Sequence, residues 1–196
     1  MAESDEDRDA ARKPGAAQAF RLARRTFMAG ERIDMQSLAA ELGVDRTTLF
    51  RWVGNRDRLL VDILTSLADP TLRDIESSLT ESGGRRIAVA AGEYAQALIN
   101  APYYRSFLQR EPERALRLIT TKASSLQQHV VGIFERMIAV ENARGGLTHS
   151  LGTHDLAYLL VRIIESFIYS DLITGEEPDA GKVRAAIGAI LRVDAP

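Results

Sequence analysis

The chain of 196 residues contains no cysteine, which excludes disulfides and thiolate metal sites and favours a cytoplasmic location. It has only three histidines, and these lack the helical spacing and the neighbouring carboxylates of a metal site. No apolar run approaches the roughly 20 residues that a membrane-spanning helix needs, and the polar, acidic start is unlike a signal peptide. We therefore expect a cytoplasmic protein that needs no membrane, metal ion or cofactor.

Motifs of catalytic chemistry are missing as well. The sequence has no glycine-rich phosphate loop, no nucleophile elbow and no paired catalytic carboxylates. An active site assembled from residues far apart in the sequence is the alternative that remains open. We expect that the protein is not an enzyme.

The hydrophobic residues that are present follow helical spacing. They make up 45% of the chain, beside 27% charged residues, which indicates a folded globular protein. They recur at intervals of three and four, with no convincing alternation of period two. Pro70 should bend or interrupt the helix that begins at Arg56. The sequence therefore predicts an all-α fold, with further helices over residues 15–29, 85–100, 103–109, 112–142, 154–173 and 182–193.

Residues 34–64 hold two short helices with a glycine between them. Asp34 and Asp45 each precede an apolar helical pattern and can accept hydrogen bonds from its first N–H groups. Gly43 ends the first helix, because a positive φ costs glycine nothing. The inward positions are Met35, Leu38, Ala39, Leu42, Leu49 and Val53. This pattern is typical of a helix-turn-helix, with residues 46–53 as the helix that enters the major groove.

The outer side of residues 46–53 suits DNA. Arginine can bond bidentately to guanine, while hydroxyls and an indole N–H suit phosphates or base edges. A purely structural three-helix unit is the alternative reading of the same segment. The outward residues are Arg46, Thr47, Thr48, Arg51 and Trp52.

This segment resembles the TetR family of transcriptional regulators. The matching positions are Leu38-Ala39, Leu42-Gly43-Val44, Leu49-Phe50, Val53, Arg56 and Leu59-Leu60. The resemblance implies base reading by Gln36, Arg46, Thr47 and Arg51, and backbone contacts by Thr48, Trp52 and Arg56. Phe50, also assigned to the DNA-binding set, replaces the tyrosine of many members and so lacks a phosphate-bonding hydroxyl.

Charge is distributed unevenly along the chain. Residues 1–9 carry one Arg against five acids, residues 10–60 carry ten Lys or Arg against five, and residues 61–196 carry 14 against 17. Positive charge is thus concentrated around the helix-turn-helix, as attraction to phosphates requires. We predict a disordered acidic tail over residues 1–14, a helix-turn-helix DNA-binding domain over 15–60, and a helical effector-binding and dimerisation domain over 61–196.

The last two predicted helices indicate a homodimer. Residues 154–173 are apolar on more of the helix circumference than one core contact covers, and residues 182–193 add small residues that allow close approach. The family resemblance implies that these two helices pair with their mates across a dimer interface. A monomeric core is the alternative. A dimer would also suit a palindromic operator of double-stranded DNA.

An effector pocket is expected in the same domain. Its proposed wall is aromatic and aliphatic, and such residues are as readily plain core: Tyr94, Tyr103, Phe107, Phe134, Ile138 and Tyr158. Four more polar candidates have spacings that place them on one helix face: Arg162, Glu165, Ser166 and Tyr169. This stripe is an internal ion pair, a dimer contact or the polar anchor of a ligand.

These patterns together predict a ligand-responsive transcriptional regulator, most simply a repressor released from its operator by a small molecule. Residues 67–72 and 162–179 resemble the QsdR-type branch of the TetR family, which is associated with quorum-sensing lactone degradation. The resemblance implies a lactone or another largely apolar effector. The alternative is a helical small-molecule-binding protein or enzyme that retains the helix-turn-helix only as structure.

Overall fold

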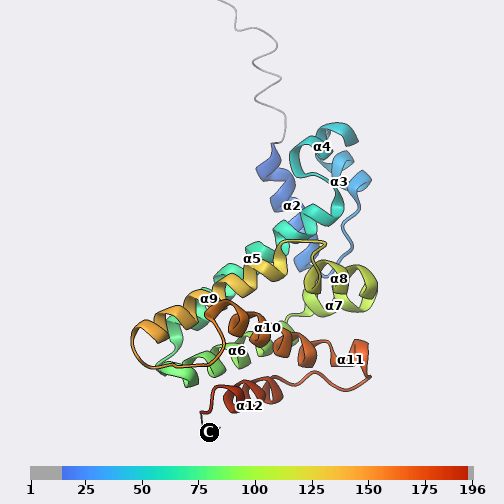
Figure 1. The fold of residues 1–196 in the computed structure, drawn as a ribbon. Coiled ribbons are helices and arrows are strands. Elements are labelled where there is room, and N and C mark those ends of the chain that lie inside the picture. The colour runs from blue at the N-terminus through green and yellow to red at the C-terminus, as the bar shows by residue number, and fades with distance from the viewer. Residues whose placement is uncertain (1–14, 194–196) are drawn as a thin grey trace, which may run out of the picture. The chain divides into compact units, whose positions relative to one another are not determined.

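The computed structural model describes residues 15–193, and the predicted disordered tail lies outside them. The described residues form helices and no strands, which confirms the all-α fold (Figure 1). The helices are α2 (Ala16–Met28), α3 (Met35–Glu41), α4 (Arg46–Val53), α5 (Arg56–Ser78), α6 (Gly83–Ile99), α7 (Pro102–Arg110), α8 (Pro112–Thr120), α9 (Leu126–Ala143), α10 (Thr153–Ile168), α11 (Ser170–Ile173) and α12 (Ala180–Ile190).

The chain divides after Ile63 into two compact units. Helix α5 belongs to both, because it begins at Arg56 and ends at Ser78. The first unit therefore holds the predicted helix-turn-helix, and the second holds every later helix. Which task each unit performs stays a prediction at this point.

The first unit is a small core of three mutually packed helices and the start of α5. Helices α2, α3 and α4 all contact one another. Leu49 of α4 is fully buried, and Phe27 of α2 and Leu38 of α3 are nearly so. Burial of these side chains stabilises helices that are too short to be stable alone.

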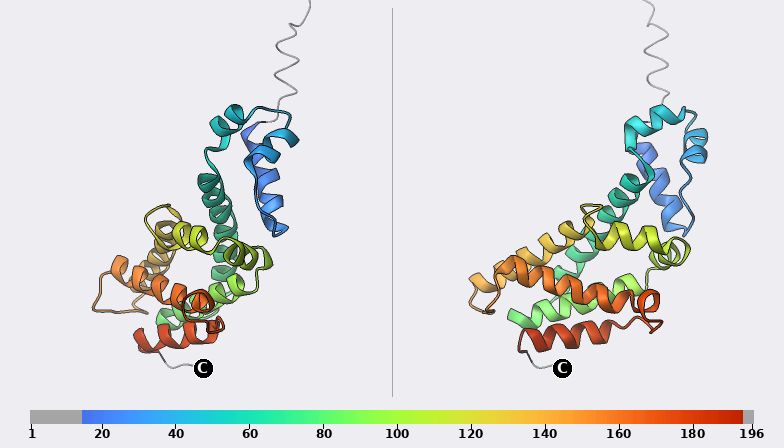
Figure 2. Two further views of the ribbon diagram at one scale, coloured as in Figure 1. Left: turned by 90° about the vertical axis from the view of Figure 1, so that its right-hand side faces the viewer. Right: turned by 45° about the vertical axis from the view of Figure 1, so that its right-hand side comes forward.

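The second unit packs its longer helices side by side. Helix α6 contacts α9, α10 and α12, and α10 contacts α9 and α12, as Figure 2 shows for the green, orange and red helices. Helix α6 has alanines and glycines on its buried sides, and a Cβ added at Gly92 would lie 3.1 Å from Arg184 Cβ of α12. Small residues on α6 therefore set the close approach of α12.

The single helix predicted over residues 112–142 is wrong. The structure has α8 and α9 there, with residues 121–125 between them. The Thr121 hydroxyl donates to the Arg117 carbonyl at 2.6 Å, and the Ser124 hydroxyl donates to the Leu118 carbonyl. These side chains take carbonyls that continued helical N–H groups would otherwise use, which favours a break.

Two further helix predictions need correction. Pro70 does not interrupt α5: the proline is exposed, and the neighbouring Thr71 hydroxyl donates to the Leu67 carbonyl at 2.8 Å within the same stretch of helix. The helix predicted over residues 154–173 instead ends at Ile168, and α11 follows Tyr169. The Ser170 hydroxyl donates to the carbonyls of Phe167 and Glu176, which ties the chain at this break.

Candidate functional site

Two aspartates fix the helices of the predicted helix-turn-helix. Asp34 accepts hydrogen bonds from the N–H groups of Gln36 at 3.1 Å and Ser37 at 2.8 Å, and Asp45 accepts one from Thr48 at 2.8 Å. The backbone N–H of Ser37 lowers the pKa of Asp34, and that of Thr48 lowers the pKa of Asp45, because each bond favours the carboxylate. Both carboxylates therefore act as charged N-caps.

The turn between α3 and α4 depends on a glycine, as the sequence indicated. Gly43 has φ +66°, a conformation that side chains rarely adopt. Its N–H bonds to the Ala40 carbonyl at 3.1 Å, and the next N–H, of Val44, reaches the Ala39 carbonyl at 3.0 Å. This turn sets the direction in which α4 leaves α3.

Helix α4 presents a basic and aromatic outer face. Arg46, Thr47 and Arg51 are exposed, and Phe50 is 58% exposed. Gln36 of α3 is exposed as well. We call these five residues the α4 face; its two guanidinium groups, hydroxyl and amide can all donate to DNA.

Three side chains predicted to contact DNA are less exposed than the sequence suggested, and two of them already form hydrogen bonds within the protein. Thr48 and Trp52 are half-buried, and the Thr48 hydroxyl donates to the Asp45 carboxylate at 2.9 Å. Arg56 is half-buried too, and its Nε donates to the Ile33 carbonyl at 2.6 Å. Arg56 thus fastens the start of α5 to the segment between α2 and α3, in addition to any contact with a phosphate.

The second unit encloses an apolar cavity. It holds about 700 Å³ of space between atoms, solvent at its edge included. Its walls come from six helices, α5 to α10. The lining residues are Leu64, Leu67, Ala68, Thr71, Tyr94, Ala97, Leu98, Tyr103, Tyr104, Ile119, Leu126, Gln127, Val130, Val161, Ile164, Glu165, Ile168 and Tyr169.

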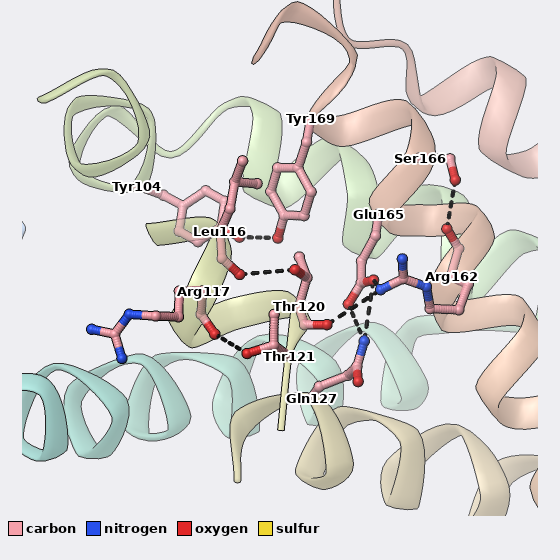
Figure 3. A network of polar contacts seen from close by, with 10 residues as sticks. All are labelled: Tyr104, Leu116, Arg117, Thr120, Thr121, Gln127, Arg162, Glu165, Ser166 and Tyr169. Atoms are coloured by element: carbon pink, nitrogen blue, oxygen red, sulfur yellow. Dashed lines mark hydrogen bonds and ion pairs between the residues drawn. The ribbon is translucent and has the colours of Figure 1, made fainter. Parts of the chain in front are cut away.

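A buried carboxylate forms the centre of a polar network on the cavity wall (Figure 3). Glu165 is 6% exposed and accepts bonds from Gln127 Nε2 at 2.9 and 3.2 Å and from Arg162 Nη1 at 2.5 Å. Burial raises the pKa of Glu165, and the bonds from Gln127 and Arg162 oppose that rise. Arg162 also reaches the Thr120 carbonyl at 3.4 Å, which ties α10 to the end of α8.

Tyrosine hydroxyls supply the other polar groups of the wall. The hydroxyls of Tyr104 and Tyr169 lie 2.5 Å apart and are buried. Tyr94 is 6% exposed, and its ring packs against Phe134 with centroids 6.4 Å apart. Burial raises the pKa of all three hydroxyls well above the ordinary value, so each stays a neutral donor and acceptor.

The predicted ligand residues fall into two groups. Tyr94, Tyr103, Glu165 and Tyr169 line the cavity. The other six do not line it: Phe107, Phe134 and Ile138 are buried elsewhere in the second unit, and Tyr158, Arg162 and Ser166 are exposed. Whether any of them binds a ligand stays a prediction.

The helix face predicted for residues 162, 165, 166 and 169 is buried along one edge and exposed along the other. Glu165 and Tyr169 are buried, whereas Arg162 and Ser166 are exposed. The members of each pair are four residues apart, so they follow one another along the same edge of the face. The Arg162–Glu165 contact is nonetheless an ion pair within the chain.

Sequence reasoning missed most of the wall, and two parts of it show why. Leu64, Leu67 and Ala68 of α5 line the cavity, although their spacing of three and four was a visible signal. Gln127 had no such signal, because its partner Glu165 is 38 residues away. Only the folded chain brings these two side chains together.

Within residues 15–193, no helix is long and apolar enough to span a bilayer. No group of three or more His, Asp or Glu side chains there is arranged to hold a metal ion.

Comparison with known proteins identifies relatives. A family model described as the tetracyclin repressor-like C-terminal domain matches residues 82–192. The transcriptional repressor QsdR of R. erythropolis, from the TetR family, is 29% identical, with a TM-score of 0.83 over 92% of this chain and 96% of that one. No curated protein matches the chain.

Two more distant structures share the fold. The TetR family repressor AlkX of Dietzia sp. strain DQ12-45-1b, implicated in n-alkane biodegradation, is 20% identical, with a TM-score of 0.58 over 93% and 98% of the two chains. The regulator FadR of Bacillus subtilis, solved with stearoyl-CoA, is 12% identical, with a TM-score of 0.56 over 90% and 95%. The likeness to QsdR agrees with the branch expected from the sequence. Because the family model matches more than half of its residues, the chain belongs to the TetR family of transcriptional regulators.

Proposed function

We propose that the protein is a repressor that binds a palindromic operator as a homodimer and leaves it when a small molecule enters the cavity of the second unit. The observation that carries this proposal is the extent of α5. The helix begins at Arg56, whose Nε donates to the Ile33 carbonyl in the first unit. The same helix lines the cavity with Leu64, Leu67 and Ala68.

The continuity of α5 supports a mechanism. A ligand that contacts α5 favours the position of α5 that suits those contacts. The ligand shifts the balance between DNA-bound and released states only by its difference in affinity for the two. In a dimer, a change of a few Å in the separation of the two α4 helices would lose contacts in one of two major grooves, which lie about 34 to 36 Å apart.

The outer sides of α10 and α12 support a dimer. Tyr158 of α10 is 48% exposed, and Ala185 and Ala189 of α12 are exposed. The residues beside Tyr158 on α10, Leu159 and Ile163, are only half-buried. Pairing with a second copy would bury this apolar strip.

The relatives support repression as the regulatory role. QsdR and AlkX are both named as repressors. A repressor acts on the chromosome, so we place the protein in the cytoplasm. The competing role is a helical small-molecule-binding protein that retains the α4 face only as structure, and it is the alternative that the following experiment excludes or supports.

The test is selection of duplexes from a random DNA library by the purified full-length protein at physiological salt. We expect enrichment of a two-fold symmetric site. Arg46→Ala should relax base preference at one position of each half-site by about 1 to 3 kcal/mol, since a bidentate arginine contact is lost. Arg73→Ala, an exposed arginine of α5 in the second unit, is the matched control and should leave the selected site unchanged.

Dimerisation is tested separately by sedimentation. Tyr158→Asp places a charge in the exposed strip of α10 and should shift the protein from dimer to monomer without unfolding it. Recovery of random sequences by a folded, dimeric protein would favour the competing role instead.

A further inference from the structure

The cavity wall carries one formal charge. Glu165 is the only carboxylate among the lining residues, all of which lie in the described part of the chain, and no lysine, arginine or histidine is among them. Arg162, which pairs with Glu165, does not line the cavity, and its side chain is 45% exposed. A ligand therefore meets the carboxylate but no lining cation.

Glu165 retains capacity to accept another hydrogen bond. A carboxylate offers about four lone-pair sites. In this structure its partners are a single nitrogen of Gln127 and a single nitrogen of Arg162. A donor on a ligand in the cavity can add to these bonds or replace the one from Gln127, which itself lines the cavity.

Tyr94 offers a donor on the same wall. Its side chain is nine-tenths buried and lines the cavity. The phenol hydroxyl of a cavity-lining tyrosine can donate one hydrogen bond, so an acceptor on a ligand in the cavity would be bound at this point.

We infer that the effector is an uncharged, largely apolar molecule carrying a hydrogen-bond donor for Glu165 beside an acceptor for Tyr94, as in an amide, and that the cavity rejects anionic head groups. This inference rests on the proposed function only in naming the ligand an effector. An anion would lie beside the Glu165 charge in an apolar cavity with no lining base. A cation would lose its hydration in this apolar cavity, and the ion pair of Glu165 with Arg162 weakens the attraction that could compensate for that loss.

The experiment uses three ligands with the same alkyl chain. Isothermal calorimetry on the full-length protein at pH about 8 compares decanamide, decanoate and decan-1-amine, since carboxylates ionise near pH 4 and amines near pH 10. Decanamide should bind, and decanoate should bind at least about tenfold more weakly. Tyr94→Phe should weaken decanamide about fivefold, because the donor for its carbonyl is lost.

Two variants test the role of the charge. Glu165→Gln keeps the shape and an acceptor but removes the charge, and the preference for decanamide over decanoate should fall below about threefold. Glu135→Gln removes a carboxylate of α9 that lies outside the cavity and is the matched control, with the preference unchanged. If Glu165→Gln fails to fold by circular dichroism, Arg162→Gln replaces it, and decan-1-amine should then bind more tightly than to the unaltered protein.

Two results would overturn the inference: decanoate binding as tightly as decanamide, or no binding of decanamide to the folded protein. Loss of operator selection with decanamide binding intact would instead overturn the proposed function and leave the ligand class standing. The two failures are therefore distinguishable.

Discussion

The two units hold their polar side chains by contacts of different range. In the first unit, Asp34, Asp45 and Asn55 bond to N–H groups two or three residues further along the chain. In the second unit, the Gln127–Glu165 bond spans 38 residues, and the Tyr104–Tyr169 bond spans 65. The first unit is thus held by local polar contacts around an apolar core, and the second by polar contacts between distant helices.

The difference has an energetic consequence. The bonds of the first-unit caps are exposed, so water can replace a lost partner. Three long-range bonds of the second unit, Gly83–Glu141, Tyr104–Tyr169 and Gln127–Glu165, are buried or part-buried, so removing one partner leaves the other with little access to water. Removing a buried partner costs the full desolvation of the group left behind. Substitutions of polar or special backbone residues should therefore have larger effects in the second unit.

The largest effect is expected at Gly83, where α6 begins. Its φ is +61°, and a Cβ there would lie 2.2 Å from the Gly146 carbonyl oxygen, which follows α9. Gly83→Ala should lower the free energy of unfolding by about 3 to 5 kcal/mol, because it adds backbone strain to a clash with backbone. Urea denaturation followed by circular dichroism measures the change.

Gly145→Ala is the control for Gly83→Ala. Gly145 has φ +73°, but nothing lies within 4 Å of an added Cβ. It should therefore cost only about 1 kcal/mol, the strain of the left-handed conformation. Equal losses for the two variants would show that the close approach of residues 83 and 146 does not matter.

The next effect is expected at Glu141 of α9, which is 2% exposed. It accepts the Gly83 N–H at 2.7 Å and an Arg144 bond at 3.1 Å. Glu141→Ala should cost about 2 to 3 kcal/mol in the same urea measurement, since a buried N–H loses its acceptor. Glu141→Gln keeps an acceptor for the Gly83 N–H and should lower the free energy of unfolding by less than Glu141→Ala does. If Glu141→Gln lowers it by more, the charge of Glu141, and not its bond to Gly83, holds α6 to α9.

A long-range bond in the first unit sharpens the comparison. Arg56 and Ile33 are 23 residues apart, and their bond is part-buried. Arg56→Ala should cost about 1 to 2 kcal/mol, whereas Arg58→Ala, two residues on and exposed, should change the free energy of unfolding little. If both variants have the same free energy of unfolding as the unaltered protein, the Arg56 side chain does not stabilise the fold and its role is confined to DNA binding.

The range of the contacts also explains what the sequence could reveal of the fold. Both caps and the Gly43 turn were predicted because each depends on residues at most five apart. The break at residues 121–125 was not, because apolar spacing continues across it and only the folded chain shows which carbonyls the hydroxyls take.

The candidate sites follow the same rule. Four of the five residues of the α4 face lie on one side of one helix, so periodicity was enough to find most of it. The cavity is lined by six helices, and helical spacing cannot tell a residue on its wall, such as Tyr94, from one packed behind it, such as Phe134. Periodicity reports that a side chain points inward and does not report whether space remains there.

The smallest effect concerns the charge on the cavity wall. Burial raises the pKa of Glu165 above its usual 4.5, against the bonds from Gln127 and Arg162. Between pH 4.5 and the pKa of the folded state, the folded protein thus holds a proton that the unfolded chain has already released. Its contribution to stability is full below pH 4.5 and is lost as the pH rises through the folded pKa.

The expected fall in stability with rising pH can be tested by comparing the unaltered protein with a variant that lacks the Glu165 charge. The free energy of unfolding of the unaltered protein minus that of Glu165→Gln should fall as the pH rises from 4.5 and then become constant. The subtraction removes the titration of every other group that the two proteins share, provided that it lies too far from Glu165 to be coupled to it. A difference that instead rises with pH would mean that the ion pair with Arg162 outweighs desolvation. The carboxylate would then already be fully compensated within the protein, and the preference for uncharged ligands would have to come from the shape of the cavity rather than from its charge.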